Sequence, residues 1–254
     1  MITIGLSVHF KEIMNARQIP IEPLDDEPPA ADHRHRVASE RRARMRERLI
    51  EATRAVYSQS TGGRRPVIDD VIRAADVSRG TFYKYFDSLD EVLSELGRDA
   101  ANEMLLSFDR LFGPLNDAAV MLATGPLMAL ARAAMDPPHG AIISHADMVD
   151  RISGDDPRRQ LVYRSLSFGR DQGVFEFDSI EAAFDLVIGT SVEGARRISR
   201  TGELDGGGIR ETVAMLLRGL GMERSSARRA VDTAWRLLQD ASPHLHWWKP
   251  VSPL

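Results

Sequence analysis

A short block at residues 78–86 carries side chains whose types and spacing suit the binding of nucleic acid. It reads Ser-Arg-Gly-Thr-Phe-Tyr-Lys-Tyr-Phe and contains hydroxyls, phenols and two cations without a single acid. Arginine, lysine and hydroxyl side chains donate hydrogen bonds to base edges and phosphates, and a glycine allows close approach of the backbone. The chemistry that this block offers is therefore recognition of a polar surface such as a DNA groove.

The distribution of charge favours the same interpretation, although the net charge of −4 alone argues against it. Residues 33–86 hold 13 Lys and Arg against six Asp and Glu, a net of +7. Residues 1–32 have a net of −4 and residues 87–254 a net of −7. A local basic stretch is what attracts phosphates. The alternative is that this stretch only forms a solvated surface.

The residues before this block predict the elements that must position it. Met45, Leu49, Ala52 and Val56 recur at helical spacing on one face of an Arg-rich helix. A second short helix follows over about 67–75, and Ser78 is the expected N-cap of a third helix over 79–86. Two short helices joined by a tight turn form a helix-turn-helix, which presents the start of its second helix to the major groove.

The stretch from about 44 to 96 resembles the DNA-binding domain of the TetR family of transcriptional regulators. The string Val-Ser-Arg-Gly-Thr-Phe-Tyr-Lys-Tyr-Phe carries the resemblance, together with the leading helix and the amphipathic helix that starts at Ser88. The resemblance implies base contacts from Arg79, Thr81 and Lys84, with phosphate contacts from Tyr83 and Tyr85. With the basic residues before it, the expected DNA-binding set is Arg41, Arg42, Arg44, Arg46, Arg64, Arg65, Ser78, Arg79, Gly80, Thr81, Tyr83, Lys84 and Tyr85.

Three positions depart from the usual TetR pattern. Val67 stands where a capping Ser or Thr commonly begins the second helix, so a cap and a phosphate contact are expected to be missing there. Asp76 occupies the turn position usually held by Gly, and Asp tolerates the left-handed conformation better than most residues. Leu89 replaces a common Lys, which makes the arginines near the N-terminus more important.

The rest of the chain predicts helices only, so the expected fold is all-α: a three-helix helix-turn-helix domain followed by a helical ligand-binding and dimerisation domain. Expected helices cover about 88–112, 116–135 with a kink or break at Gly125-Pro126, 140–152, 157–173, 178–200 capped by Asp178, 208–219, and from Ser225 or Ser226 to 242. The expected domains are a disordered arm (1–38), the DNA-binding domain (39–87), the helical domain (88–241) and a tail (242–254).

The family resemblance implies a homodimer formed by helices 179–200 and 208–219, and a ligand pocket between the DNA-binding and dimer elements. The helix over 179–200 is apolar on two sides, which predicts burial against its own core and a partner, the alternative being a fully internal helix. Expected interface residues are Phe184, Ile188, Ser191, Ala195, Ile198, Val213, Leu216, Leu217 and Leu220. Expected pocket residues, each of which is otherwise plain core, are Met104, Phe108, Phe112, Met121, Met128, Met135, Met148, Tyr163 and Phe168.

Other classes of protein find little support in the sequence. The chain has no cysteine, which favours a cytoplasmic setting, and no apolar run approaches the roughly 20 residues of a membrane span. No enzyme motif, metal site or cofactor is expected, since His139, His145 and Asp147 lack ligand spacing, and the two histidines are expected at the surface. The sequence predicts a ligand-responsive repressor that binds a palindromic DNA operator as a homodimer and responds to a small, apolar molecule. The alternative is a helical small-molecule or lipid-binding protein with a vestigial DNA-binding head.

Overall fold

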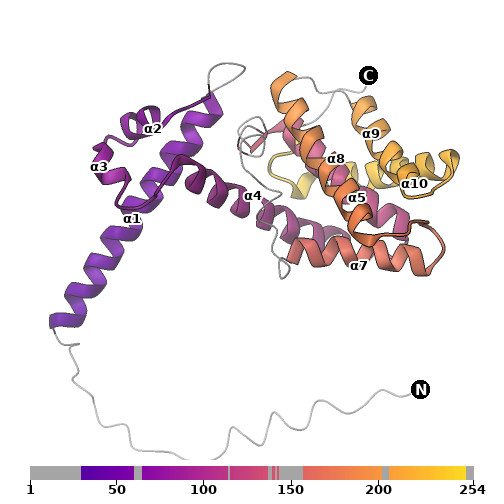
Figure 1. Ribbon diagram of the computed structural model, residues 1–254, viewed down its shortest axis with the longest axis horizontal. Coiled ribbons are helices and arrows are strands. Elements are labelled where there is room, and N and C mark those ends of the chain that lie inside the picture. The colour runs from indigo at the N-terminus through magenta and orange to yellow at the C-terminus, as the bar shows by residue number, and fades with distance from the viewer. Residues whose placement is uncertain are drawn as a thin grey trace, which may run out of the picture. The chain divides into compact units, whose positions relative to one another are not determined.

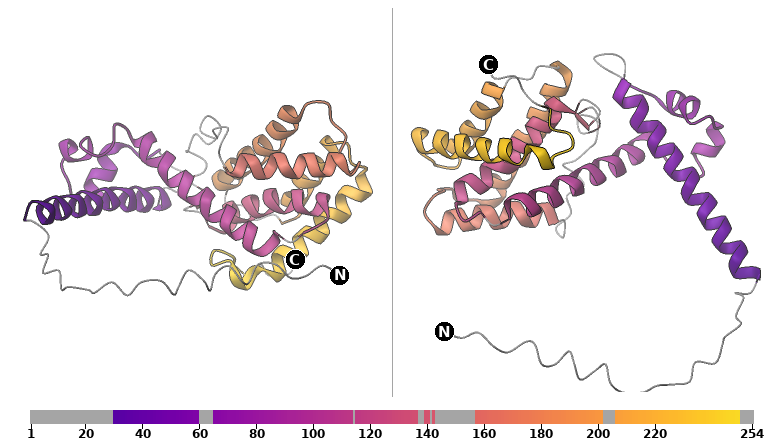
Figure 2. Two further views of the ribbon diagram at one scale, coloured as in Figure 1. Left: turned by 90° about the horizontal axis from the view of Figure 1, so that it is seen from below. Right: turned by 180° about the vertical axis from the view of Figure 1, so that it is seen from behind.

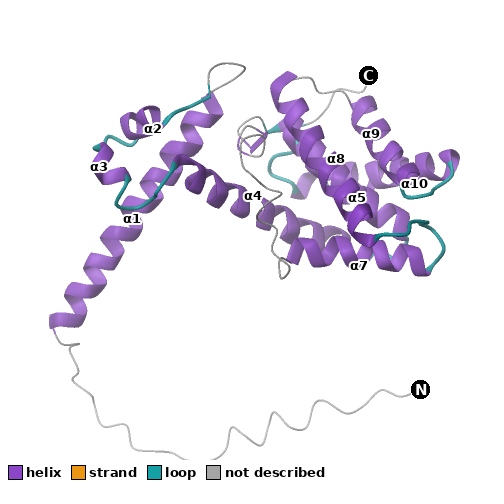
Figure 3. Cartoon of the chain, viewed as in Figure 1, coloured by secondary structure: helices purple, strands orange, loops and turns teal. Residues whose placement is uncertain are grey.

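The structure is a computed structural model, and it describes residues 30–59, 65–113, 115–136, 139, 140, 142, 157–201 and 206–249, with backbone alone for 30–35, 157 and 158. Every regular element among these residues is a helix (Figure 3), which confirms the all-α prediction. The chain divides into two compact units, Met1–Ala43 and Arg44–Leu254. Most of the helix predicted over 140–152 lies outside the described residues.

The N-terminal helices form a small head with its own core. It consists of α1 (Ala30–Gln59), α2 (Ile68–Ala74), α3 (Arg79–Phe82) and the start of α4 (Leu89–Phe112), all labelled in Figure 1. Helix α1 begins nine residues earlier than the apolar pattern predicts, because residues 30–38 contain helix-forming Ala and Arg but no apolar stripe. The buried side chains of the head are Leu49, Ile50, Tyr57, Val71, Ala75, Phe82, Phe86, Val92, Leu93 and Leu96.

The turn between α2 and α3 has the conformation that the sequence predicts. Asp76 has a φ of 50°, so it adopts the left-handed conformation in place of the usual Gly. The amide of Val77 donates to the carbonyl of Ile72 at 3.0 Å, which closes a Schellman motif. At the other end of α2, Val67 offers no capping side chain, but Asp70 accepts from its amide at 3.0 Å. Half of a capping box thus remains.

The larger helical core is built around α5 (Ala118–Met135). This helix contacts α4, α7 (Pro157–Asp171), α8 (Ile180–Thr201), α9 (Gly206–Gly219) and α10 (Arg224–Asp240), and Figures 1 and 2 show it among them. It is one continuous helix through Pro126, so of the kink or break expected at Gly125-Pro126 the break does not occur. Helix α5 is also apolar and long enough to cross a membrane, which the sequence analysis missed, but 78% of it is buried within the fold. It is a core helix.

The structure shows which side chains cap the starts of α8 and α10. The hydroxyl of Ser179, rather than Asp178, accepts from the amide of Ala182 at 3.1 Å at the start of α8. The carboxylate of Glu223 accepts from the amides of Ser225 and Ser226 at the start of α10. The hydroxyl of Ser225 also donates to this carboxylate, and that hydrogen bond, together with those from the two amides, lowers the pKa of Glu223 to about 2. Near a helix start several polar residues compete for the cap, and the backbone geometry decides between them.

Residues 242–249, which belong to the predicted C-terminal tail, pack on the core. A short 3₁₀ turn (Ser242–His244) follows α10, and the side chains of Leu245 and Trp247 are buried. The guanidinium of Arg132 on α5 lies 5.7 Å from the centre of the Trp247 ring. This segment therefore covers part of α5.

Candidate nucleic-acid interface and ligand cavity

Helix α3 is fixed to the head through its buried aromatic residue and its cap. Phe82 is fully buried and lies 6.0 Å, centre to centre, from the ring of Phe86. The hydroxyl of Ser78 accepts from the amide of Thr81 at 3.1 Å and lies 2.9 Å from the Thr81 hydroxyl. The side chains that do not take part in this packing are consequently held on the outer surface of the head.

The exposed part of this segment contains most of the predicted base-reading residues. Ser78, Arg79, Gly80, Tyr83 and Lys84 are exposed, and Tyr83 keeps 48% of its surface accessible. Thr81 and Tyr85 are half-buried. Hydroxyls, a phenol and two cations thus share one short, outward-facing segment.

Arg79 has a partner within the head that the sequence analysis did not predict. Its Nη2 donates to Oδ1 of Asp69 on α2 at 2.5 Å, and this contact raises the pKa of the guanidinium. Both side chains are more than half exposed. The pair ties the outer end of α3 to the start of α2 while leaving the arginine on the surface.

Several arginines predicted to contact DNA have partners inside the head. Arg46 forms a bidentate pair with Glu95 on α4, and its guanidinium lies 4.7 Å from the centre of the Phe86 ring. Arg65 donates to Asp90 at 2.6 Å. Both arginines therefore link neighbouring segments of the head, which is a structural role beside any role at DNA. Arg64 lies outside the described residues.

The other arginines of α1 in the predicted DNA-binding set, Arg41, Arg42 and Arg44, are exposed. Arg41 and Arg42 belong to the first unit, and Arg44 begins the second. Their places along one helix with exposed side chains fit contacts with phosphates, which demand charge but little geometry.

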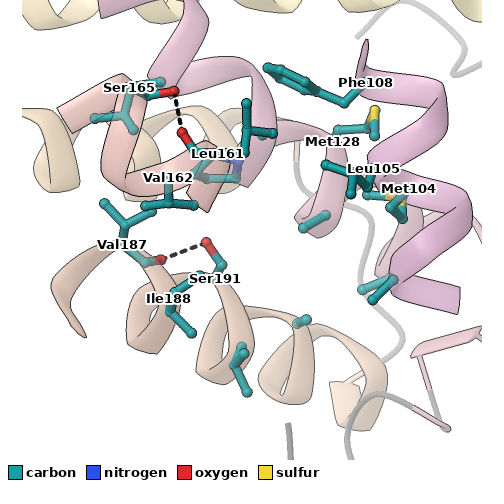
Figure 4. Close-up of a pocket in the computed structure, with 18 of the residues that line it drawn as sticks. Met104, Leu105, Phe108, Met128, Leu161, Val162, Ser165, Val187, Ile188 and Ser191 are labelled. Carbon is teal, nitrogen blue, oxygen red and sulfur yellow. Dashed lines mark hydrogen bonds between the residues drawn. The ribbon is translucent and has the colours of Figure 1, made fainter. Parts of the chain in front are cut away.

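An apolar cavity of about 220 Å³ lies between α4, α5, α7 and α8. Figure 4 shows Met104, Leu105 and Phe108 of α4 facing residues of α7 and α8 across it. The hydroxyls of Ser165 and Ser191 lie in its wall but donate to backbone carbonyls of their own helices, at 2.9 and 2.7 Å. The cavity therefore suits a small molecule that is largely apolar.

Four of the nine predicted pocket residues line this apolar cavity: Met104, Phe108, Met121 and Met128. Phe112 and Met135 are buried elsewhere in the core, Tyr163 stacks on Phe184 at 4.9 Å, and Phe168 is 37% exposed. Met148 lies outside the described residues. Residues that the sequence analysis did not include complete the wall, among them Leu161, Val162, Val187 and Val192.

His139 is a further residue of this wall that was dismissed as a surface histidine. It is only 8% exposed, and the prediction of a surface position is wrong. Burial and the charge of Arg132 lower its pKa from 6.5 to about 3. His139 is therefore neutral near pH 7 and compatible with an apolar wall.

The stripe predicted as the dimer interface lies inside the protomer. Phe184, Ala195 and Ile198 of α8 are buried, and Ile188, Ser191 and Ala195 line the apolar cavity. The predicted residues Val213, Leu216 and Leu217 of α9, and Leu220 just after it, are also buried in the core. The apolar pattern correctly predicted that these residues are buried. They are buried against the core of the same chain.

The outward faces of α8 and α9 carry a different set of residues. Ala182, Gly189 and Glu193 are exposed on α8, at spacings that place them on one side of the helix. Met215 of α9 is 60% exposed, and a side chain added at Gly189 would meet no atom within 4 Å. The small residues Ala182 and Gly189 leave room for another helix to approach beside the charged Glu193.

Comparison with known proteins finds likeness in structure. No family model matches the sequence, and no curated protein matches it. The structure of RolR in complex with resorcinol superposes with a TM-score of 0.58 at 19% identity, covering 76% of this chain and 95% of RolR. A gamma-butyrolactone receptor (ArpA-like protein) matches with 0.50 at 18% identity, covering 79% and 98%. The fatty acid degradation regulator FadR from Bacillus halodurans matches with 0.51 at 19% identity, covering 68% and 98%.

Proposed function

We propose that this chain, whose fold is that of the TetR-type regulators, is a DNA-binding transcriptional regulator. The observation that carries the proposal is the geometry of α3 and the turn after it: Phe82 and Phe86 anchor this segment in the head, while Arg79, Tyr83 and Lys84 remain exposed. Packing requires the two phenylalanines but does not require an outward face of cations, hydroxyls and phenols without acids. Recognition of base edges and phosphates does require it.

The regulator acts as a homodimer on a palindromic operator. Two heads are needed because one short helix contacts too few bases, and two-fold symmetry of the protein matches two half-sites about one turn of DNA apart. We assign the dimer contact to the outward faces of α8 and α9, around Gly189 and Met215. Arg41, Arg42 and Arg44 add phosphate contacts.

A small apolar ligand in the cavity between α4, α5, α7 and α8 controls binding. Helix α4 both packs in the head, through Val92 and Leu93, and lines the apolar cavity, through Met104 and Phe108. A ligand that fits one position of α4 better than another shifts the equilibrium by its differential affinity. Another protein with this fold binds a small molecule: RolR was solved in complex with resorcinol. The protein represses transcription while it is bound to the operator, and binding of the ligand releases it from the DNA.

Selection of genomic fragments bound by the purified protein tests the function, followed by titration of the selected site at several salt concentrations. A regulator enriches a palindromic site, and its affinity falls steeply between low and moderate salt. The apolar cavity also fits the alternative of a small-molecule or lipid-binding protein with a vestigial head. That protein would enrich no sequence and would bind its ligand independently of salt, an outcome that rejects the regulator.

A further inference from the structure

A second cavity of about 230 Å³ lies beside the apolar one, and its wall is charged where the first is apolar. We call it the polar chamber. Helices α1, α4 and α5, the residues His139 and Ile142, and the C-terminal segment contribute to it. Its polar lining residues are Arg54, Asp99, Glu103, Arg132, Asp136, His139 and His246.

Arg132 is the deepest charge in the polar chamber. Its side chain is 5% exposed, its Nη2 donates to Glu103 at 2.8 Å, and its Nε lies 3.7 Å from a carboxylate oxygen of Asp136. Within the described residues, Nε and Nη1 have no hydrogen-bond partner although both are buried. Buried guanidinium groups are normally saturated with acceptors, so an acceptor is missing here.

The charges around Arg132 indicate which kind of acceptor fits. Asp99, Glu103 and Asp136 supply three carboxylates against the guanidinium groups of Arg54 and Arg132, and His139 is neutral near pH 7. The Nε2 of His246 lies 3.5 Å from a carboxylate oxygen of Glu103. An anionic group would face an excess of carboxylates. A hydroxyl accepts from an arginine and at the same time donates to a carboxylate, so it matches both halves of this wall.

The two cavities are neighbours across the contact between α4 and α5. On α4, Glu103 lines the polar chamber and the next residue, Met104, lines the apolar cavity. On α5, Arg132 lines the polar chamber and Ala133 lines the apolar cavity. His139 belongs to both walls. A molecule with an apolar body and a polar end could therefore contact the apolar cavity with its body and the polar chamber with its end, on either side of His139.

We propose that the ligand is a neutral, hydroxyl-bearing molecule, an alcohol or phenol, whose apolar body fills the apolar cavity and whose hydroxyl is bound at the Arg132 side of the polar chamber. This inference rests on the proposed function of the apolar cavity as the ligand site. It adds the chemical class of the ligand and assigns the specificity for the hydroxyl to Arg132, with Asp136 and Glu103 as acceptors.

Calorimetric titration of the full-length protein with four matched probes tests the class of ligand. The probes are 4-propylphenol, its methyl ether 4-propylanisole, propylbenzene and 4-propylbenzoate. We expect the phenol to bind about tenfold more tightly than propylbenzene, because its hydroxyl gains hydrogen bonds that involve charged groups. The methyl ether, which accepts but does not donate, and the benzoate should both bind more weakly than the phenol. Equal affinity for phenol and propylbenzene, or preference for the benzoate, overturns the proposal.

Two variants then locate the hydroxyl and the body. Arg132→Met keeps much of the side-chain volume and should abolish the preference for the phenol while leaving the affinity for propylbenzene. Arg170→Met, which removes an arginine that stacks on Phe177 outside both cavities, is the control and should change neither. Gly125→Leu fills the apolar cavity, where a Cβ at Gly125 meets no atom within 4 Å, and should abolish binding of every probe. If Arg132→Met does not fold, Arg132→Lys and the phenol-to-ether ratio of the unmodified protein take its place.

The outcomes separate this inference from the function on which it rests. If propylbenzene binds and Gly125→Leu blocks it, the apolar cavity is a ligand site, and an unchanged phenol preference in Arg132→Met rejects only the role of Arg132. If no probe binds, both the class of ligand and its place in this cavity are rejected. DNA binding is measured separately, and its outcome affects neither the assignment of the ligand site nor the role of Arg132.

Discussion

The guanidinium of Arg79 on α3 donates to the carboxylate of Asp69 on α2, with 2.5 Å between Nη2 and Oδ1. Both side chains are exposed, so the pair contributes little to stability. Its effect is on geometry, because it restricts the rotamers of the arginine that the proposed function places at the DNA. An arginine that is already oriented loses less entropy when it binds a base.

Arg79→Ala should therefore weaken binding to the operator by about 1–3 kcal/mol and relax the preference at one base position. Arg73→Ala is the matched control, because Arg73 forms a similar pair with Asp70, at 3.7 Å, but lies on α2. Titration of the operator, of single-base variants and of random DNA measures both effects. An equal loss on random DNA would assign Arg79 to a phosphate contact.

Arg44 and Arg46 should respond in opposite ways to substitution, although both belong to the same basic run. Arg46 pairs with Glu95 and stacks on Phe86, so Arg46→Ala should lower the free energy of unfolding by roughly 1–3 kcal/mol. Arg44 is exposed, and Arg44→Ala should leave stability unchanged while weakening DNA binding at all sequences alike. Urea denaturation and DNA titration of both variants decide. Equal stability of the two would mean that the contacts of Arg46 contribute nothing.

This pair of arginines also marks the limit of the sequence analysis for the head. The string around Arg79 identifies the helix-turn-helix, and the turn at Asp76 follows from backbone preference alone. Which of two neighbouring arginines faces inward depends on Glu95, about 50 positions later in the chain. Local spacing contains no information on that contact.

The helical core shows a similar limit on a larger scale. Apolar periodicity on α8 predicts that Phe184, Ala195 and Ile198 are buried, and they are. Burial against the protomer and burial against a partner require the same residue types, so the pattern cannot distinguish them. Only four of the nine predicted pocket residues line the apolar cavity for the same reason: periodicity places Met104 and Met128 inside but does not show where packing leaves space.

The outward faces of α8 and α9 provide the test of the dimer. Met215→Glu places a charge on an exposed position, so the protomer should fold normally, whereas two glutamates near a two-fold axis would be buried without partners. We expect a monomer at micromolar concentration and loss of operator binding. Leu106→Glu is the control, since Leu106 is 71% exposed on α4. Sedimentation of both variants measures the state. A dimer that survives Met215→Glu but not Leu106→Glu would move the interface to α4.

Acid should destabilise the fold through His139. Burial and the Arg132 charge lower its pKa from 6.5 to about 3, so the unfolded chain takes up a proton as the pH falls below 6.5 while the folded chain does not. The resulting stabilisation is complete above pH 6.5 and is lost as the pH falls towards 3. His139→Gln should therefore reduce the slope of the free energy of unfolding against pH, by up to about 1.4 kcal/mol per pH unit within that window. His244→Gln, at an exposed position, is the control and should retain the slope. Urea denaturation at a series of pH values measures it, and identical slopes in the unmodified protein and His139→Gln would show that the folded chain protonates this ring as readily as the unfolded one.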